Sequence, residues 1–203
     1  MTALGPGLVH VPGYLSRERQ GELAAAVADV IRDAPPFRPR MPRTGRPFSV
    51  RMTNCGHLGW VSDEAGYRYQ PEHPDTGRPW PAMPELLLRA WTELSGVDVL
   101  PEACLVNMYD ANARMGLHQD RDEETVAAPV LSLSLGDTAV FRIGGLGRTD
   151  RTRSIRLQSG DAFLFGGASR LVFHGIDRVL AGSSALLPGG GRINLTLRRV
   201  RPV

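Results

Sequence analysis

Apolar positions divide the chain into a first part with helical spacing and a longer second part with the spacing of strands. Residues 16 to 32 place four aliphatic side chains at helical intervals behind Ser16, a residue type that can cap a helix N-terminus. Residues 84 to 95 predict a second helix, with Pro84 in its first turn and Gly96 just past its end. We therefore expect two amphipathic helices before the β-rich part.

From residue 103 onward, apolar residues alternate with polar ones or run together over lengths typical of strands. The predicted strands are residues 104–109, 130–135, 138–143, 153–157, 162–165, 170–174 and 192–198. Glycine-rich turns separate many of them, and no helical pattern lies between them. Many short strands without intervening helices indicate an antiparallel sandwich or jelly roll, so the expected fold class is mainly β (α+β).

The composition changes between residues 34 and 84. Prolines cluster there with arginines interleaved, which excludes a long helix. The aromatic side chains of Trp60, Tyr67, Tyr69 and Trp80 fall in the same stretch. We expect short strands and loops that form a surface lobe, within one domain that spans residues 1 to 203 and has its jelly-roll core at about residues 100 to 203.

Composition argues against a membrane protein and against a disulfide scaffold. Hydrophobic residues make up 42% of the chain, and no apolar run approaches the ~20 residues that span a bilayer. The N-terminus does not resemble a signal peptide, so we expect a cytoplasmic protein without a membrane partner. Cys55 and Cys104 are expected to be reduced thiols near the core. All 24 basic side chains are arginine, at a net charge of +3. Because arginine suits phosphate recognition, nucleic acid is an open partner class.

Candidate metal chemistry lies in the segment Leu117 to Asp122 and in the later His174. His118 and Asp120 are two residues apart, so in a strand or at its end both side chains project from the same side. Two imidazoles and one carboxylate form a facial ligand set for non-haem iron(II), which leaves positions open for dioxygen and a bidentate co-substrate. Taken alone, a His-x-Asp pair is a chance-level motif, and a histidine between apolar residues is usually packed in a core.

The strand predicted over residues 192 to 198 gives that pattern more weight. Alternation puts four polar side chains on one of its faces, those of Arg192, Asn194, Thr196 and Arg198. Arginines that face a core need anionic partners, and a small dicarboxylate would satisfy them through charge-assisted hydrogen bonds. A solvent-exposed polar face is the alternative for this strand alone. The metal-ligand pattern that precedes it favours the buried reading.

On these motifs, the sequence resembles the iron(II)/2-oxoglutarate dioxygenases, and among them the bacterial AlkB-type nucleic-acid dealkylases. The resemblance covers nearly the whole chain from the first helix on. The matching segments are residues 52–60, 79–84, 117–120, 144–146, 169–171, 174–176 and 192–198.

The resemblance implies a role for each matching position. The iron ligands would be His118, Asp120 and His174. The 2-oxoglutarate site, with an arginine on the far carboxylate, would comprise Asn107, Met108, Tyr109, Arg192, Asn194 and Arg198. The damaged base would lie against Trp60, opposite the ring of His118, with Asp122 facing its edge. The contacts with the backbone of the nucleic-acid strand would come from Tyr67, Tyr69 and Arg148. Lobe packing and ordinary solvated charges are the alternatives for these outer positions.

The resemblance also implies a fold and an activity. The fold is a double-stranded β-helix, or jelly roll, with N-terminal helices and a nucleotide-recognition lobe. The activity is oxidative dealkylation of N-alkylated bases of the 1-methyladenine and 3-methylcytosine type in DNA. The resemblance does not decide whether RNA and double-stranded nucleic acids are also substrates. Fe(II), 2-oxoglutarate and O2 would be used, and formaldehyde, succinate and CO2 released. The assembly expected from the family is a monomer.

The physical chemistry of the substrate agrees with that assignment. A base alkylated on a ring nitrogen is cationic, so an aromatic face and a carboxylate favour it over the normal base. It must also leave the stack to reach a buried metal. Two alternatives are kept: a 2-oxoglutarate-dependent hydroxylase or demethylase acting on a protein or small molecule, and a metal-binding jelly roll that is not an enzyme.

Two positions depart from the best-known bacterial member of the family. Met108 stands where that member has arginine, and Phe165 stands where it has tryptophan. Neither change removes a predicted ligand. Both leave the range of lesions open.

Overall fold

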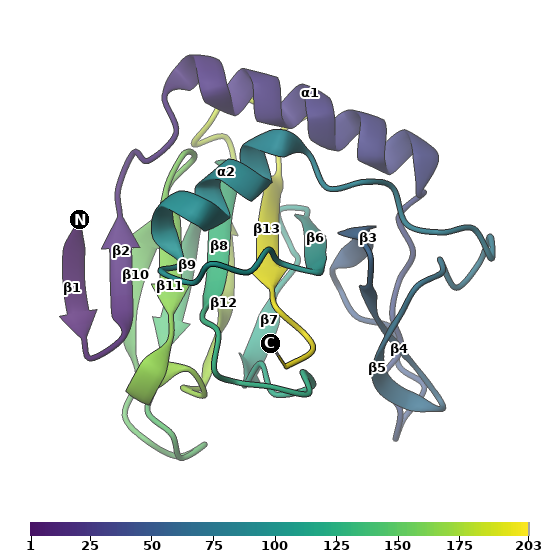
Figure 1. Cartoon of the computed structure of the whole chain (residues 1–203). Coiled ribbons are helices and arrows are strands. Elements are labelled where there is room, and N and C mark those ends of the chain that lie inside the picture. Colours follow the sequence, from purple (N-terminus) through teal and green to yellow (C-terminus); the bar gives the residue numbers. More distant parts are fainter. Residues whose placement is uncertain (203) are drawn as a thin grey trace.

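Two antiparallel sheets packed face to face form the body of the protein, which a computed structural model describes for residues 1 to 202 (Figure 1). The larger sheet has the spatial order β1 (Thr2–Gly5), β2 (Leu8–Val11), β11 (Ala162–Phe165), β8 (Val130–Gly136), β13 (Arg192–Arg198), β6 (Ala103–Tyr109) and β3 (Arg51–Gly56). The smaller sheet has the order β10 (Arg153–Leu157), β9 (Thr138–Ile143), β12 (His174–Leu180) and β7 (Met115–His118). The predicted jelly roll is confirmed.

Two apolar layers hold these sheets in place. Between the sheets, Phe163 of the larger sheet packs with Phe141 and Ile176 of the smaller one. On the other face of the larger sheet, Leu131 and Leu195 lie in a second cluster with side chains from both helices. Figure 1 shows the helices across the top and front of this sheet. Burial of both faces of the larger sheet explains its long apolar runs.

Both predicted helices are confirmed, α1 as Arg17–Asp33 and α2 as Glu85–Leu94. The Ser16 hydroxyl accepts a hydrogen bond from the Arg19 N–H at 3.3 Å, which is the expected N-terminal cap. α2 begins directly after Pro84 and is followed by Gly96. Within the described residues, neither helix has the length and apolarity needed to cross a membrane.

The predicted lobe at residues 34 to 84 divides between two parts of the fold. β3 pairs with β6 at the edge of the larger sheet, with Cys55 opposite Cys104. β4 (Gly59–Asp63) and β5 (Gly66–Gln70) instead form a separate hairpin, at the right of Figure 1. The proline-rich composition hid the role of β3, because pairing with a strand some 50 residues later is not a local property.

The predicted strands did not include β1, β2, β7 or most of β12, and one predicted strand was misplaced. The strand predicted at residues 170 to 174 is wrong: Gly167–Ser169 forms one turn of 3-10 helix, and β12 begins only at His174. The cause is the buried Arg170, whose guanidinium donates to the carbonyl oxygens of Asp120 at 2.6 Å and Ala128 at 3.0 Å. These long-range contacts outweigh the local β pattern. The other predicted strands are confirmed to within one residue at each end.

Candidate active site

A cavity of about 640 Å³ lies between the two sheets and the β4–β5 hairpin. All predicted site residues except Met108 line this cavity. They are Trp60, Tyr67, Tyr69, Asn107, Tyr109, His118, Asp120, Asp122, Arg148, His174, Arg192, Asn194 and Arg198. Residues from distant parts of the sequence thus meet in a single space.

Met108 lies on the opposite face of β6 and packs against the apolar cluster under the helices. Its neighbours Asn107 and Tyr109 both line the cavity. Alternation along a strand requires this arrangement, because successive side chains point to opposite faces. The prediction that Met108 belongs to the 2-oxoglutarate site is therefore wrong for its side chain.

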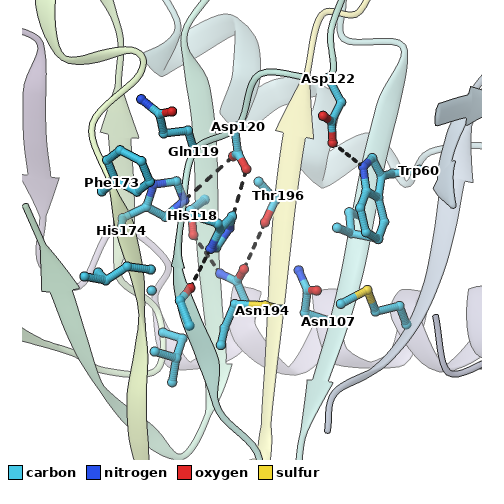
Figure 2. A pocket seen from close by; sticks show the side chains of 18 of the residues that line it. Trp60, Asn107, His118, Gln119, Asp120, Asp122, Phe173, His174, Asn194 and Thr196 are labelled. Carbon is cyan, nitrogen blue, oxygen red and sulfur yellow. Dashed lines mark hydrogen bonds and ion pairs between the residues drawn. The ribbon is translucent and has the colours of Figure 1, made fainter. Parts of the chain in front are cut away.

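The predicted metal ligands converge at one end of the smaller sheet. Antiparallel pairing of β7 with β12 sets His118 directly opposite His174, and Asp120 follows two residues after β7 ends (Figure 2). The candidate ligand atoms of the three residues lie within 4.8 Å of one another. Gly175 permits this close pairing, because a Cβ there would lie 2.5 Å from the Met115 carbonyl oxygen. The sheet itself therefore builds the site.

Both histidines present the same ring nitrogen to this site. His118 Nδ1 lies 2.9 Å from the carbonyl oxygen of Gly116, and His174 Nδ1 lies 3.0 Å from that of Val172. Because a carbonyl oxygen only accepts, Nδ1 must carry the proton and donate, which leaves the lone pair on Nε2. His118 Nε2 is 3.6 Å and His174 Nε2 is 3.9 Å from an oxygen of Asp120. Two neutral imidazoles and one carboxylate fit iron(II).

Burial and nearby charges keep Asp120 and His174 in the protonation states that a metal requires. Burial alone would raise the pKa of Asp120, but the Arg198 guanidinium and the two imidazoles lower it well below its usual range. An Arg198 Nη2 donates to Asp120 Oδ2 at 2.8 Å. Burial, and then the electrostatic interaction with the neighbouring His118, lowers the pKa of His174 to about 4. Asp120 is therefore ionised and His174 neutral at physiological pH.

This shift predicts a pH dependence of stability for the metal-free protein. Between pH 6.5 and about 4 the unfolded chain protonates His174 while the folded protein does not, so the free energy of unfolding falls as pH decreases through this window. The loss should be on the order of 3 kcal/mol. Urea unfolding of metal-free protein across this pH range measures it. The variant His174→Gln should lose that part of the slope, and an unchanged slope would contradict the assignment.

The other part of the cavity contains a buried guanidinium that is not neutralised. Arg192 is 1% exposed and donates only to neutral oxygens, those of Asp137 and Leu157 in the backbone and Ser134 Oγ. No described residue forms an ion pair with it. Burial lowers the pKa of Arg192 to about 10, so it is still charged at neutral pH. An isolated buried charge is costly, and an anionic ligand would offset that cost.

Unpaired polar atoms mark the same region. Within residues 1 to 202, three buried side-chain atoms lack a hydrogen-bond partner: Asn107 Oδ1, Arg192 Nε and Arg198 Nη1. All three belong to residues that line the cavity and were predicted to bind 2-oxoglutarate. Asn194 lies beside them, with its amide donating to Ser132 Oγ at 2.6 Å and accepting from Thr196 (Figure 2). The two unused arginine donors beside a metal site fit a dicarboxylate co-substrate.

The hairpin places aromatic side chains over the mouth of the cavity. The Trp60 indole Nε1 donates to Asp122 Oδ2 at 2.8 Å (Figure 2), and the Tyr67 ring stacks on Trp60 with a centroid distance of 5.6 Å. Tyr67 is half exposed, whereas the Tyr69 hydroxyl donates to Glu123 at 2.6 Å. Arg148 lies over the Phe173 ring at 5.8 Å from the centroid. The Tyr69 hydroxyl is thus held by a buried carboxylate, whereas Tyr67 and Arg148 are exposed.

Sequence reasoning missed two buried charged residues at this site, Glu123 and Arg170. Their side chains form an ion pair at 3.1 Å and are almost fully buried. Glu123 belongs to a run of acidic residues that looks like an exposed loop in the sequence. Only its spacing of three residues from Asp120 hinted at a role.

Comparisons with known proteins agree with this geometry. The 2OG-Fe(II) oxygenase superfamily matches residues 7–198. An alpha-ketoglutarate-dependent dioxygenase AlkB homolog of Caulobacter vibrioides is 57% identical, over 97% of this chain and 89% of its own length. The alpha-ketoglutarate-dependent dioxygenase AlkB of Escherichia coli is 44% identical, over 88% of this chain and 83% of its own. The solved structure of OsALKBH1 superimposes with a TM-score of 0.81 at 30% identity and covers 98% of this chain and 99% of its own. The chain therefore belongs to the 2OG-Fe(II) oxygenase superfamily and, within it, to the AlkB family of iron(II)/2-oxoglutarate-dependent nucleic-acid dealkylases, which makes it a dioxygenase that uses Fe(II), 2-oxoglutarate and O2.

Proposed function

We propose that the enzyme removes alkyl groups from ring nitrogens of nucleic-acid bases, of the 1-methyladenine and 3-methylcytosine type, in single-stranded DNA and also in RNA. The observation that carries the proposal is the Trp60–Asp122 pair at the mouth of a cavity that also contains the His-Asp-His cluster. An aromatic face beside a carboxylate favours a cationic, flipped base over a neutral one. The proposal includes a monomer that acts in the cytoplasm.

Each group of residues would have a distinct task. His118, Asp120 and His174 would hold the iron, and Arg192 with Arg198 would hold the two carboxylates of 2-oxoglutarate. When bound, the iron and 2-oxoglutarate would activate O2, which supplies the oxidising equivalents that hydroxylate the alkyl carbon of the base.

The remaining side chains bind and orient the substrate. Trp60 would stack on the base, and the Asp122 side chain would lie close to its positive charge. Phe141 and Phe165 pack against His174, at centroid distances of 5.8 and 4.6 Å, and keep water from that side of the site. Tyr67 and Arg148 are both exposed and would contact the backbone of the nucleic-acid strand. The hydroxylated product then loses its modified carbon as an aldehyde and restores the base.

Replacing Trp60 by alanine tests this substrate class. The variant should lose most turnover of a 1-methyladenine single strand, roughly 10- to 100-fold in kcat/KM, because one base loses its stacking platform, worth ~1–3 kcal/mol. Binding of 2-oxoglutarate should be unchanged. Mass spectrometry of the oligonucleotide, incubated with enzyme, iron(II), 2-oxoglutarate, ascorbate and oxygen, follows the loss of one methyl group.

Trp60→Phe is the matched control. It keeps an aromatic face but cannot donate to Asp122, so its activity should fall between those of the wild type and Trp60→Ala. Repair by Trp60→Ala at the wild-type rate would refute base recognition at this position. Failure of the wild-type enzyme to remove the methyl group would refute the proposed function itself.

A further inference from the structure

The hairpin is attached to the metal-ligand segment at two points that are paired with each other. Trp60 on β4 and Tyr69 on β5 are direct partners in the hairpin register. Trp60 donates to Asp122 at 2.8 Å, and Tyr69 donates to Glu123 at 2.6 Å. Asp122 and Glu123 are consecutive residues that follow the metal ligand Asp120 closely in the chain. The cross-strand pair Trp60–Tyr69 therefore contacts two consecutive residues just after the metal ligand Asp120.

Glu123 connects the inner attachment to the catalytic centre. Its side chain is 1% exposed and forms ion pairs with Arg170 and Arg198, each at 3.1 Å. Arg198 is shared, because it also donates to Asp120 at 2.8 Å. A continuous path of buried contacts thus runs from the Tyr69 hydroxyl through Glu123 and Arg198 to the carboxylate that would bind iron.

The burial of this path makes its parts interdependent. A buried carboxylate that loses one of its partners cannot replace it with water, so neighbouring groups must shift to satisfy it. Arg170 limits those shifts, since it also holds the Asp120 carbonyl oxygen at 2.6 Å. A displacement of the hairpin therefore reaches Asp120 and Arg198 through a few stiff contacts. The contact between Trp60 and Asp122 is exposed and exchanges more easily with water.

We propose that Tyr69 and Glu123 are positioning residues that latch the β4–β5 hairpin to the metal-ligand segment, so that the hairpin's position sets those of Asp120 and Arg198. Tyr69 acts from inside the protein and not on the nucleic-acid backbone, which revises the role expected for it. A hairpin held in this position keeps Asp120 and Arg198 in place. The inference rests on the proposed function only for the identity of the substrate.

The variant Tyr69→Phe tests the latch, because it removes one hydroxyl and keeps the ring. Hydrogen-exchange mass spectrometry would be run on enzyme loaded with manganese(II) and 2-oxoglutarate, without nucleic acid. Loss of a hydrogen bond to a buried charged group should speed exchange roughly tenfold, both in residues 59 to 70 and in residues 118 to 123. Glu123→Gln, which keeps the shape but removes the charge, should have the same effect.

Tyr67→Phe is the matched control from the same strand, since the Tyr67 hydroxyl has no hydrogen-bond partner among the described residues. It should leave exchange in residues 118 to 123 at the wild-type rate. A second measurement compares formaldehyde with succinate during turnover of a methylated single strand. The ratio of formaldehyde to succinate should fall several-fold in Tyr69→Phe. A displaced hairpin leaves Asp120 and Arg198 out of position, so that more 2-oxoglutarate is consumed without dealkylation.

Faster exchange confined to the hairpin, or no change in either segment, would overturn the latch. The latch would also be overturned if Tyr67→Phe speeds hydrogen exchange in residues 118 to 123 as much as Tyr69→Phe does. The exchange measurement contains no nucleic acid, so its outcome is independent of the proposed substrate. Failure of the wild-type enzyme to release formaldehyde from the methylated strand would instead count against the proposed function and leave the latch standing.

Discussion

Replacing Asp120 by asparagine is expected to weaken metal binding by more than about 100-fold and to abolish dealkylation. Changes to groups that merely orient metal ligands cost ~10- to 100-fold in affinity, and Asp120 would itself be a ligand. Its carboxylate also supplies the negative charge between two imidazoles and the Arg198 guanidinium. An amide keeps the shape but removes that charge. Titration with manganese(II) measures the affinity, and formaldehyde release measures turnover.

Asp177→Asn is the matched control for this variant. Asp177 lies on β12, the strand that carries His174, but it is only half-buried and forms only a long ion pair with Arg178 at 3.7 Å. Metal affinity should therefore be that of the wild type. If Asp120→Asn bound manganese(II) as tightly as the wild type, the proposed ligand set would be wrong. Thermal unfolding of the metal-free variants separates loss of ligation from loss of the fold.

The variant Arg192→Met should lose 2-oxoglutarate binding while the metal still binds. Two hydrogen bonds to a charged partner contribute together about 3 kcal/mol or more, which corresponds to at least ~100-fold in affinity. With manganese(II) present, 2-oxoglutarate at about 100 times its Kd should stabilise the wild type by ~2.7 kcal/mol, or roughly 5–10 °C in Tm. The variant should show no such shift at the same concentration.

Arg156→Met provides the comparison for Arg192→Met. Arg156 lies on β10 and is exposed, so its removal should leave the thermal shift intact. A full shift in Arg192→Met would show that the co-substrate carboxylate is bound elsewhere. A variant that binds neither manganese(II) nor 2-oxoglutarate would indicate general disruption of the cavity, and Arg192→Lys, which keeps the charge without the planar fork, should then recover the metal site alone.

Strand β13 shows how far local pattern can reach. Its alternation predicted which side chains share a face, and the structure confirms that Arg192, Asn194 and Arg198 line the cavity while Leu195 packs on the other side. The same rule would have excluded Met108, which alternates between two cavity residues. At this position strand geometry, and not the resemblance to the family, gives the direction of the side chain.

The strand prediction at residues 170 to 174 failed for the opposite reason. Leu171, Val172 and Phe173 have strong β propensity, yet the chain turns there because Arg170 is held by the loop around Asp120. A buried arginine is stabilised by partners that lie some 50 residues earlier. A prediction from the residues close to position 170 does not take these partners into account.

The sequence by itself determined the class of fold, the helix ends and the chemical types gathered in the site. These depend on periodicity, capping and side-chain chemistry, which act over a few residues. Only the tertiary structure decided that His118 pairs with His174, that Glu123 is buried between two arginines, and that Tyr69 points inward. These arrangements depend on strand register and on long-range charge partners, and both exist only once the two sheets and the hairpin have packed together.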